Sequence, residues 1–164
     1  MPFLRPAEDF HDRAQLIFRQ ERALLAARGV PGELSLTGGT SVPGALTKGD
    51  VDLHHRVVPD HFAAAVDRLR DLHAVVFPEI WQPTLATFAI GAELPTGLAA
   101  TPIGSEHDRR FTRTWQLLAA HPELLAEYNA MKMQHIQADD ATYRHHKSLF
   151  FDRLLELWPE EPLE

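Results

Sequence analysis

The chain has 164 residues, of which 45% are hydrophobic and 24% charged, and this composition predicts a single soluble globular domain over residues 1–164. Its net charge of −7 argues against an extended nucleic-acid-binding surface, and the absence of cysteine excludes disulfides, thiolate nucleophiles and cysteine-zinc sites. The N-terminus carries acidic residues instead of an apolar leader, and no segment has the length to span a bilayer. We therefore expect a cytoplasmic protein that does not bind membranes.

The first half of the chain predicts a helix, two strands and a second helix. Residues 6–28 carry apolar side chains at helical spacing, and glycine and proline follow directly. Residues 33–37 alternate as a strand does, 42–49 form a loop with proline and glycine, and 50–58 alternate again. We expect residues 59–73 to form the second helix.

The second half predicts three more strands followed by helices. The strands are expected over residues 74–81, 84–90 and 98–103, and the helices over 107–120, 122–136 and 139–158. The acidic tail 159–164 is expected to fray. Together these elements predict an α+β domain with an N-terminal helix and a C-terminal helical part packed on the sheet.

The most informative motif lies between the first two strands. Leu36-Thr37-Gly38-Gly39-Thr40-Ser41 is followed, one short loop later, by Asp50-Val51-Asp52-Leu53. Two glycines allow backbone N–H groups to approach an anion without a Cβ in the way, and Thr40 and Ser41 add hydroxyl donors. The turn therefore predicts a phosphate-binding site. The alternative is a plain turn before a solvated strand face.

Alternation along the second strand places Asp50, Asp52, His54 and Arg56 on one face, and Val51, Leu53, His55 and Val57 on the other. Two carboxylates spaced by one residue can share one Mg²⁺ or Mn²⁺, because hard cations prefer oxygen ligands. His54 shares their face, so it is a candidate third metal ligand or base. The other histidines lack the spacing of a zinc site and are expected at the surface or half-buried.

The order strand, glycine turn, loop and Asp-x-Asp strand resembles the polymerase-beta-type nucleotidyltransferase superfamily and, more narrowly, the GrpB family. Three further blocks resemble GrpB sequences in the same order: His121-Pro122-Glu123-Leu124, Tyr128-Asn129-Ala130-Met131-Lys132 and Tyr143-Arg144-His145-His146-Lys147-Ser148-Leu149-Phe150. The resemblance implies a nucleotidyltransferase-like mixed sheet, with Asp50 and Asp52 as the catalytic metal ligands. It further implies a nucleotide or phosphate compound bound by Gly38, Gly39, Thr40, Ser41, Lys132, Lys147 and Tyr143.

The sequence also departs from these patterns. Active members of the superfamily place a third carboxylate on a later strand, but residues 84–90 and 98–103 contain none. Gly97-Leu98-Ala99 aligns with a His-x-His of GrpB proteins, so both imidazoles are missing. Three functions therefore remain open. The first is metal-dependent nucleotidyl transfer, and the second is binding of a phosphate ligand or a protein partner, or an accessory role, without turnover. The third is a phosphotransferase or small-molecule-modifying enzyme that uses the same pocket.

Overall fold

The computed structural model describes residues 3–157 and contains a five-stranded mixed sheet. Its strands run in the order β2 (Glu33–Thr37), β4 (Val51–Val57), β7 (Thr96–Pro102), β6 (Ala86–Ile90) and β5 (Ala74–Val75). β4 and β7 pair in parallel, whereas the other neighbouring strands are antiparallel. The predicted α+β fold with a mixed sheet is confirmed.

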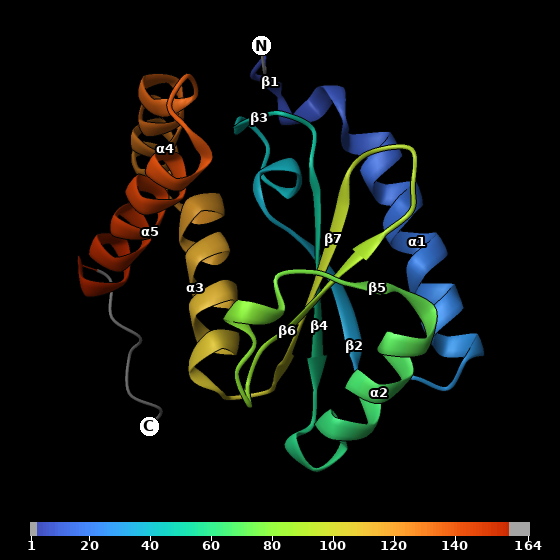
Figure 1. Cartoon of the computed structure of the whole chain (residues 1–164). Helices are drawn as coiled ribbons and strands as arrows, with labels where there is room; N and C mark the ends of the chain where they lie inside the picture. The colour runs from blue at the N-terminus through green and yellow to red at the C-terminus, as the bar shows by residue number, and fades with distance from the viewer. Residues whose placement is uncertain (1–2, 158–164) are drawn as a thin grey trace.

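Two helices, α1 (His11–Ala27) and α2 (Phe62–Leu72), cover one face of the sheet (Figure 1). The apolar side of β4 packs against them, because Val51, Leu53 and Val57 are at most 1% exposed and belong to the same core cluster as residues of both helices. The alternation predicted for this strand is therefore correct. Its polar side faces away from this core.

Three helices lie on the opposite side of the sheet: α3 (Glu106–Ala120), α4 (Pro122–His135) and α5 (Asp140–Leu157) (Figure 1). They form a second apolar core, centred on Tyr128 and Phe150. Ser105 caps α3 by accepting a hydrogen bond from the Asp108 N–H. The predicted bounds agree within one residue, except that Trp158 and the tail 159–164 lie outside the described residues. No helix between residues 3 and 157 is long and apolar enough to cross a membrane.

Two predictions about strands were wrong. Residues 74–81 form only the two-residue β5, because Phe77 adopts a left-handed φ of 49° and Pro78, which lacks an N–H, opens the short 3₁₀ turn η4 (Pro78–Ile80). The loop 42–49 contains a further short strand, β3 (Leu46–Thr47), which pairs with β1 (Arg5–Pro6). The first helix accordingly begins at His11, after the 3₁₀ turn η1 (Ala7–Asp9), and not at Pro6.

Candidate functional site

Residues 38–41, which we call the glycine turn, follow β2 and lie directly against Asp52 of β4. Gly38 has a φ of 77°, a conformation that favours glycine. A methyl group built on Gly38 would also overlap the Asp52 carboxylate. Glycine is therefore required twice at this position, once for the backbone conformation and once for the close approach to the aspartate.

The hydroxyls of Thr40 and Ser41 hold the turn in place. Thr40 Oγ1 donates a hydrogen bond to the Asp50 carbonyl oxygen at 2.5 Å, and Ser41 Oγ donates one to the Gly38 carbonyl oxygen at 2.7 Å. Both hydroxyl protons, predicted as phosphate donors, are therefore engaged with the backbone. The N–H groups of Gly39 and Thr40 begin the 3₁₀ turn η2 (Gly39–Ser41) and have no partner within it, and both residues are buried.

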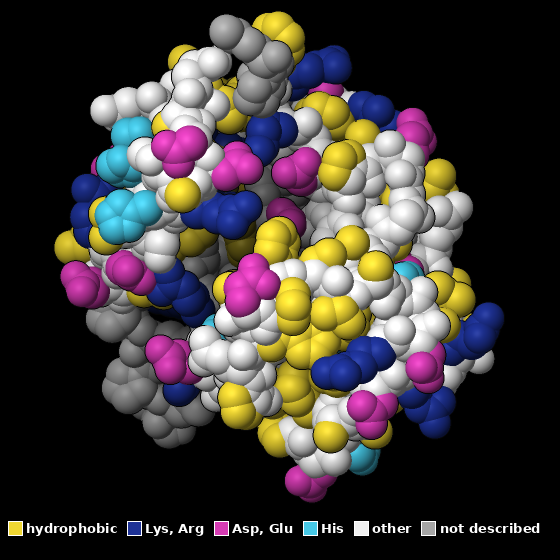
Figure 2. All heavy atoms as spheres, viewed as in Figure 1, with side chains coloured by type: hydrophobic (Ala, Val, Ile, Leu, Met, Phe, Trp, Pro, Cys, Tyr) yellow, Lys and Arg dark blue, Asp and Glu magenta, His cyan; other side chains and the backbone are white. Residues whose placement is uncertain are grey.

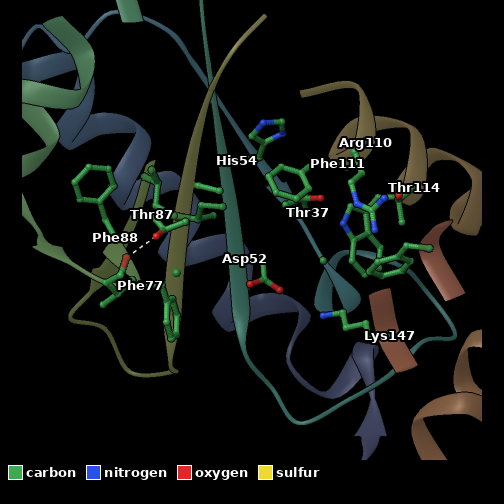
Figure 3. A pocket seen from close by; sticks show the side chains of 18 residues that line it. Thr37, Asp52, His54, Phe77, Thr87, Phe88, Arg110, Phe111, Thr114 and Lys147 are labelled. Atoms are coloured by element: carbon green, nitrogen blue, oxygen red, sulfur yellow. Dashed lines mark hydrogen bonds between the residues drawn. The ribbon is translucent and has the colours of Figure 1, made fainter. Parts of the chain in front are cut away.

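Asp52 lies on the floor of a cleft between the sheet and the C-terminal helices (Figure 3). Its carboxylate is accessible from the cleft although protein surrounds it on most sides. This partial burial raises the pKa of Asp52, the charge of Lys147 opposes the shift, and the neighbouring Asp50 reinforces it. Asp50 itself is exposed at the start of β4.

All three lysines of the chain, Lys48, Lys132 and Lys147, are at this site. Lys147 of α5 lines the cleft, and its ammonium points toward Asp52 (Figure 3). Figure 2 shows the same concentration of charge, with acidic and basic side chains around a hollow between the C-terminal helices and the sheet. Among residues 3–157, none of the three lysines forms a direct ion pair with a carboxylate. Their charge is therefore available to an anionic ligand.

Lys132 of α4 is 5% exposed and lies beside the glycine turn. Its Nζ donates a hydrogen bond to the Leu46 carbonyl oxygen at 2.5 Å. Burial, together with the positive charges of Lys147 and Lys48, lowers the pKa of Lys132 to about 8. The two aspartates oppose this shift, so the five charged groups act on one another.

Asn129, one helical turn before Lys132, fixes the loop that follows the glycine turn. Its amide nitrogen donates to the Gly44 carbonyl oxygen and its amide oxygen accepts from the Leu46 N–H, both at 2.9 Å. Asn129 thus pairs with the loop as a neighbouring strand would. The sequence block that contains Asn129 and Lys132 therefore attaches α4 to the loop between the glycine turn and the aspartates.

Aromatic rings accompany the lysine ammonium groups. The Lys132 Nζ is 5.1 Å from the ring centre of Tyr128, and the Lys48 Nζ is 5.7 Å from that of Tyr143. Burial, with a smaller effect from Asp50, raises the pKa of Tyr143 to about 12. Tyr143, predicted as a nucleotide contact, does not line the cleft and instead lies beneath Lys48.

The cleft has a volume of about 270 Å³ and two dissimilar halves. One half is polar and contains Thr37, Gly38, Asp52 and Lys147. The other half is largely apolar, with Phe77 from the β5–β6 side and Phe111, Trp115 and Phe151 from the C-terminal helices. It is also lined by Val76, Thr87, Phe88, Leu98 and Thr114, although Phe88 and Leu98 belong to the core on the other face of the sheet.

His54 also lines the cleft, but its Nε2 is bonded to Thr101 Oγ1 at 2.7 Å. Thr101 in turn donates to Asp108, which forms two hydrogen bonds with Arg56 at 2.6 and 2.9 Å. Burial lowers the pKa of His54 to about 4, against the effect of Asp108, so its imidazole is neutral at pH 7. Burial works to raise the pKa of Asp108, but the hydrogen bonds from Arg56 and Gly104 outweigh it and lower that pKa.

The predicted three-ligand metal set is not assembled. Among the residues that the structure describes, no three histidine, aspartate or glutamate side chains are grouped closely enough to hold a metal ion. His54 is held by Thr101 instead of meeting both aspartates. In the register of the sheet, Gly97 lies beside Asp52 and Ala99 beside His54, so β7 adds no ligand. The donors present fit one Mg²⁺ held by two carboxylates and ligand phosphates, and they do not fit a two-metal centre.

Most of the predicted site residues thus come together: the glycine turn, both aspartates, Lys132 and Lys147. Sequence reasoning missed Lys48, Asn129, Asp108 and the aromatic half of the cleft. Lys48 could have been predicted from the sequence, because the chain has only three lysines and the other two were already assigned to the site. The positions of Asp108 and of the aromatic half of the cleft depend on how α3 packs on the sheet, and no local sequence pattern indicates that packing.

Comparison with solved structures supports the fold. GrpB from Enterococcus faecalis is similar with a TM-score of 0.64 and 14% identity, covering 93% of this chain and 99% of that one. Cid1 bound to its short product ApU is similar with a TM-score of 0.53 and 14% identity, covering 78% of this chain and 40% of Cid1. A mutant of the Cid1 poly(U) polymerase bound to MgATP gives a TM-score of 0.54 at 14% identity, with 78% and 42% covered. At this identity these similarities establish the nucleotidyltransferase-like fold alone.

Comparison with curated proteins found no match. A family model described as GrpB protein, in contrast, matches residues 8–157. The match includes the glycine turn, both aspartates, all three lysines and the helical part that carries two of them. Because the family model matches most of the length of this chain, the chain belongs to the GrpB family.

Proposed function

We propose that the cleft binds a nucleotide or another phosphate-bearing compound, with its phosphates between the glycine turn and the lysines. The observation that carries this proposal is the convergence of all three lysines on one glycine turn. An ammonium without a carboxylate partner can pair with a phosphate oxygen, and such charge-assisted hydrogen bonds are among the strongest in proteins. Similar structures hold a UTP analog and MgATP, which supports a nucleotide as the ligand class.

Asp50 and Asp52 are the residues that would hold a divalent cation, Mg²⁺ or Mn²⁺, together with the phosphate. When bound, that ion would supply positive charge to the phosphate oxygens. Lys147 faces Asp52 across the cleft, so the phosphate would be bound between an ammonium and the carboxylate side of the site. Lys132 would then contact it from the side of the glycine turn, where its Nζ already lies close to Gly39.

Nucleotidyl transfer is the reaction that this arrangement would support if a suitable acceptor entered the cleft. Binding without turnover is the second candidate, and one observation favours it. The positions beside Asp52 and His54 on β7 are Gly97 and Ala99, so the sheet offers no third carboxylate to a second metal ion. We therefore propose ligand binding as the function, with nucleotidyl transfer as the alternative.

Calorimetry with ATP, CTP, GTP and UTP, each with and without Mg²⁺, tests the binding proposal. We expect Lys147→Gln to weaken binding about tenfold, because a charged hydrogen bond is lost. Asp50→Asn and Asp52→Asn should abolish only the part of the nucleotide affinity that depends on Mg²⁺. Arg19→Gln and Asp67→Asn change the same charges at exposed positions on α1 and α2 and should have no effect.

Two results would count against this assignment. Nucleotide binding that is indifferent to Lys147 would place the ligand elsewhere, and binding indifferent to metal and to both aspartate variants would remove the metal assignment. Incubation with α-labelled nucleotides and candidate acceptors separates the two functions, since only a transferase moves the label onto an acceptor.

A further inference from the structure

The aromatic half of the cleft begins beside Asp52, where two residues of β7 have a small side chain or none. Gly97 and Ala99 leave the sheet open beside Asp52, and the gap continues between two walls. Phe77 and Thr87 come from the β5–β6 side, whereas Phe111 and Thr114 come from α3 (Figure 3). The phosphate site described above accounts for none of this apolar volume.

Phe77 is the most unusual residue of this half. It is the only described non-glycine residue with a positive φ, and the residue is 47% exposed although it lines the cleft. Left-handed backbone is unfavourable for a bulky residue and recurs at ligand-binding positions. The guanidinium of Arg144 in α5 lies 5.5 Å from the ring centre, so Phe77 is also in contact with the C-terminal helices.

Thr114 supplies an independent observation on the opposite wall. Its side chain is buried, at 2% exposure, and lines the cleft, yet its Oγ1 has no hydrogen-bond partner among the described residues. A buried hydroxyl without a partner costs free energy. A ligand atom that donates to or accepts from this oxygen would remove that cost.

We propose that the aromatic half binds the planar heteroaromatic ring of a nucleotide, whose phosphates lie at the lysines. This inference rests on the proposed phosphate site and identifies the other end of the ligand. Phe77 stacks on the ring from the mouth of the cleft, and Thr114 forms a hydrogen bond with one of its nitrogen or oxygen atoms. A purely aliphatic tail would fill the volume but would leave Thr114 without a partner.

The test compares ATP with inorganic tripolyphosphate, which has the charges but no ring. We expect the wild-type protein to bind ATP about tenfold more tightly than tripolyphosphate, since stacking of a base on an aromatic side chain has an effect of this order. Phe77→Gly and Thr114→Val should each reduce that preference and leave tripolyphosphate binding unchanged. Neither substitution threatens the fold, because glycine accepts the positive φ and the Thr114 hydroxyl has no protein partner to lose.

Two control variants match these changes. Ile80→Ala removes an exposed apolar side chain from the segment of Phe77 but outside the cleft, and Thr112→Val removes a hydroxyl of the same helix that is bonded to the Asp108 carbonyl oxygen. Both should retain the preference for ATP.

Equal affinity for ATP and tripolyphosphate in the wild-type protein would overturn the ring site while leaving the phosphate site intact. Geranyl diphosphate binding as tightly as ATP would assign this half to an aliphatic tail and would overturn it as well. Failure of both ATP and tripolyphosphate to bind would instead overturn the phosphate site, and the ring site with it.

Discussion

Gly97 lies directly beside Asp52 in the parallel pairing of β7 with β4. A Cβ at position 97 would meet nothing closer than the Phe88 carbonyl oxygen at 3.8 Å, so the backbone accepts a larger residue. We predict that Gly97→Asp lowers the melting temperature through repulsion from Asp52, and that Mn²⁺ restores it because the new carboxylate completes a metal site.

Titration of Mn²⁺ followed by electron paramagnetic resonance measures the gain in metal affinity directly. Gly91→Asp is the matched control, since it adds the same charge at an exposed position with open space around it. If Gly97→Asp binds Mn²⁺ no better than Gly91→Asp, position 97 is not where a third ligand belongs.

Gly38→Ala should be strongly destabilising. The substitution combines a left-handed backbone with overlap against Asp52, and we expect a loss of about 2–4 kcal/mol in the free energy of unfolding. Urea denaturation measures it, and Gly91→Ala provides a control with neither penalty. Asp52→Ala should relieve part of the loss in the double variant; strict additivity would mean that the contact with Asp52 is unimportant.

The lowered pKa of Lys132 predicts that the stability of the protein depends on pH. Its pKa falls from 10.5 in the unfolded chain to about 8 in the folded protein, so between these values the unfolded state binds more protons and stability rises with pH. The contribution is complete above pH 10.5 and is lost as the pH falls through 8; its size is roughly 3 kcal/mol.

Nuclear magnetic resonance of the side chains suits this measurement, because the chain has only three lysine resonances to assign. Lys132→Met should flatten the rise in stability between the two pKa values. A wild-type Lys132 that titrates near 10.5 would contradict the prediction, and bound phosphate should move its pKa upward from 8.

Arg56→Met should destabilise the protein by about 3–5 kcal/mol, since it leaves the carboxylate of Asp108 buried without its cation. Asp108 is 1% exposed and depends on Arg56 for two hydrogen bonds. The exposed pair of Arg153 with Glu127 is the natural comparison, and Arg153→Met should cost less than about 1 kcal/mol. Chemical denaturation of both variants decides whether burial makes the difference.

Asn129→Ala should release the loop after the glycine turn. Two hydrogen bonds are lost, which predicts a cost of about 1–3 kcal/mol and faster hydrogen exchange at the Leu46 amide. Asn129→Asp keeps the acceptor for Leu46 but turns a carboxylate toward the Gly44 carbonyl oxygen, so it should be no less damaging. Exchange at Leu46 that is unchanged in the Ala variant would mean that β1 alone holds the loop.

The strands that the sequence predicted well are those whose pattern reflects burial. Val51, Leu53 and Val57 alternate with polar residues because one side of β4 faces the core, and that periodicity is visible without a structure. β3 carries no such signal, because its two residues are a strand only through pairing with Arg5 and Pro6. Residues 76–81 have strand-like composition, but Pro78 cannot donate to a ladder and the chain turns there.

The residues of the site also fall into those that local sequence predicts and those that depend on tertiary packing. The glycine turn and Asp52 are close in sequence, so local reasoning could join them, and the lysines of α4 and α5 were found through sequence blocks that resemble the family. Thr114 was not predicted, because nothing on α3 indicates that this hydroxyl is buried without a partner. His54 was correctly placed on the polar face of β4, but its attachment to Thr101 depends on a strand that pairs from 47 residues away.

The grouping of all three lysines around one site has a consequence for covalent chemistry. Acylation of lysine side chains, whether by a reagent or by an enzyme, can act on this protein only at Lys48, Lys132 and Lys147. Each acyl group would remove one of the charges that face the glycine turn. For this chain, a mass-spectrometric map of lysine acylation with and without a candidate ligand therefore reports directly on the proposed phosphate site.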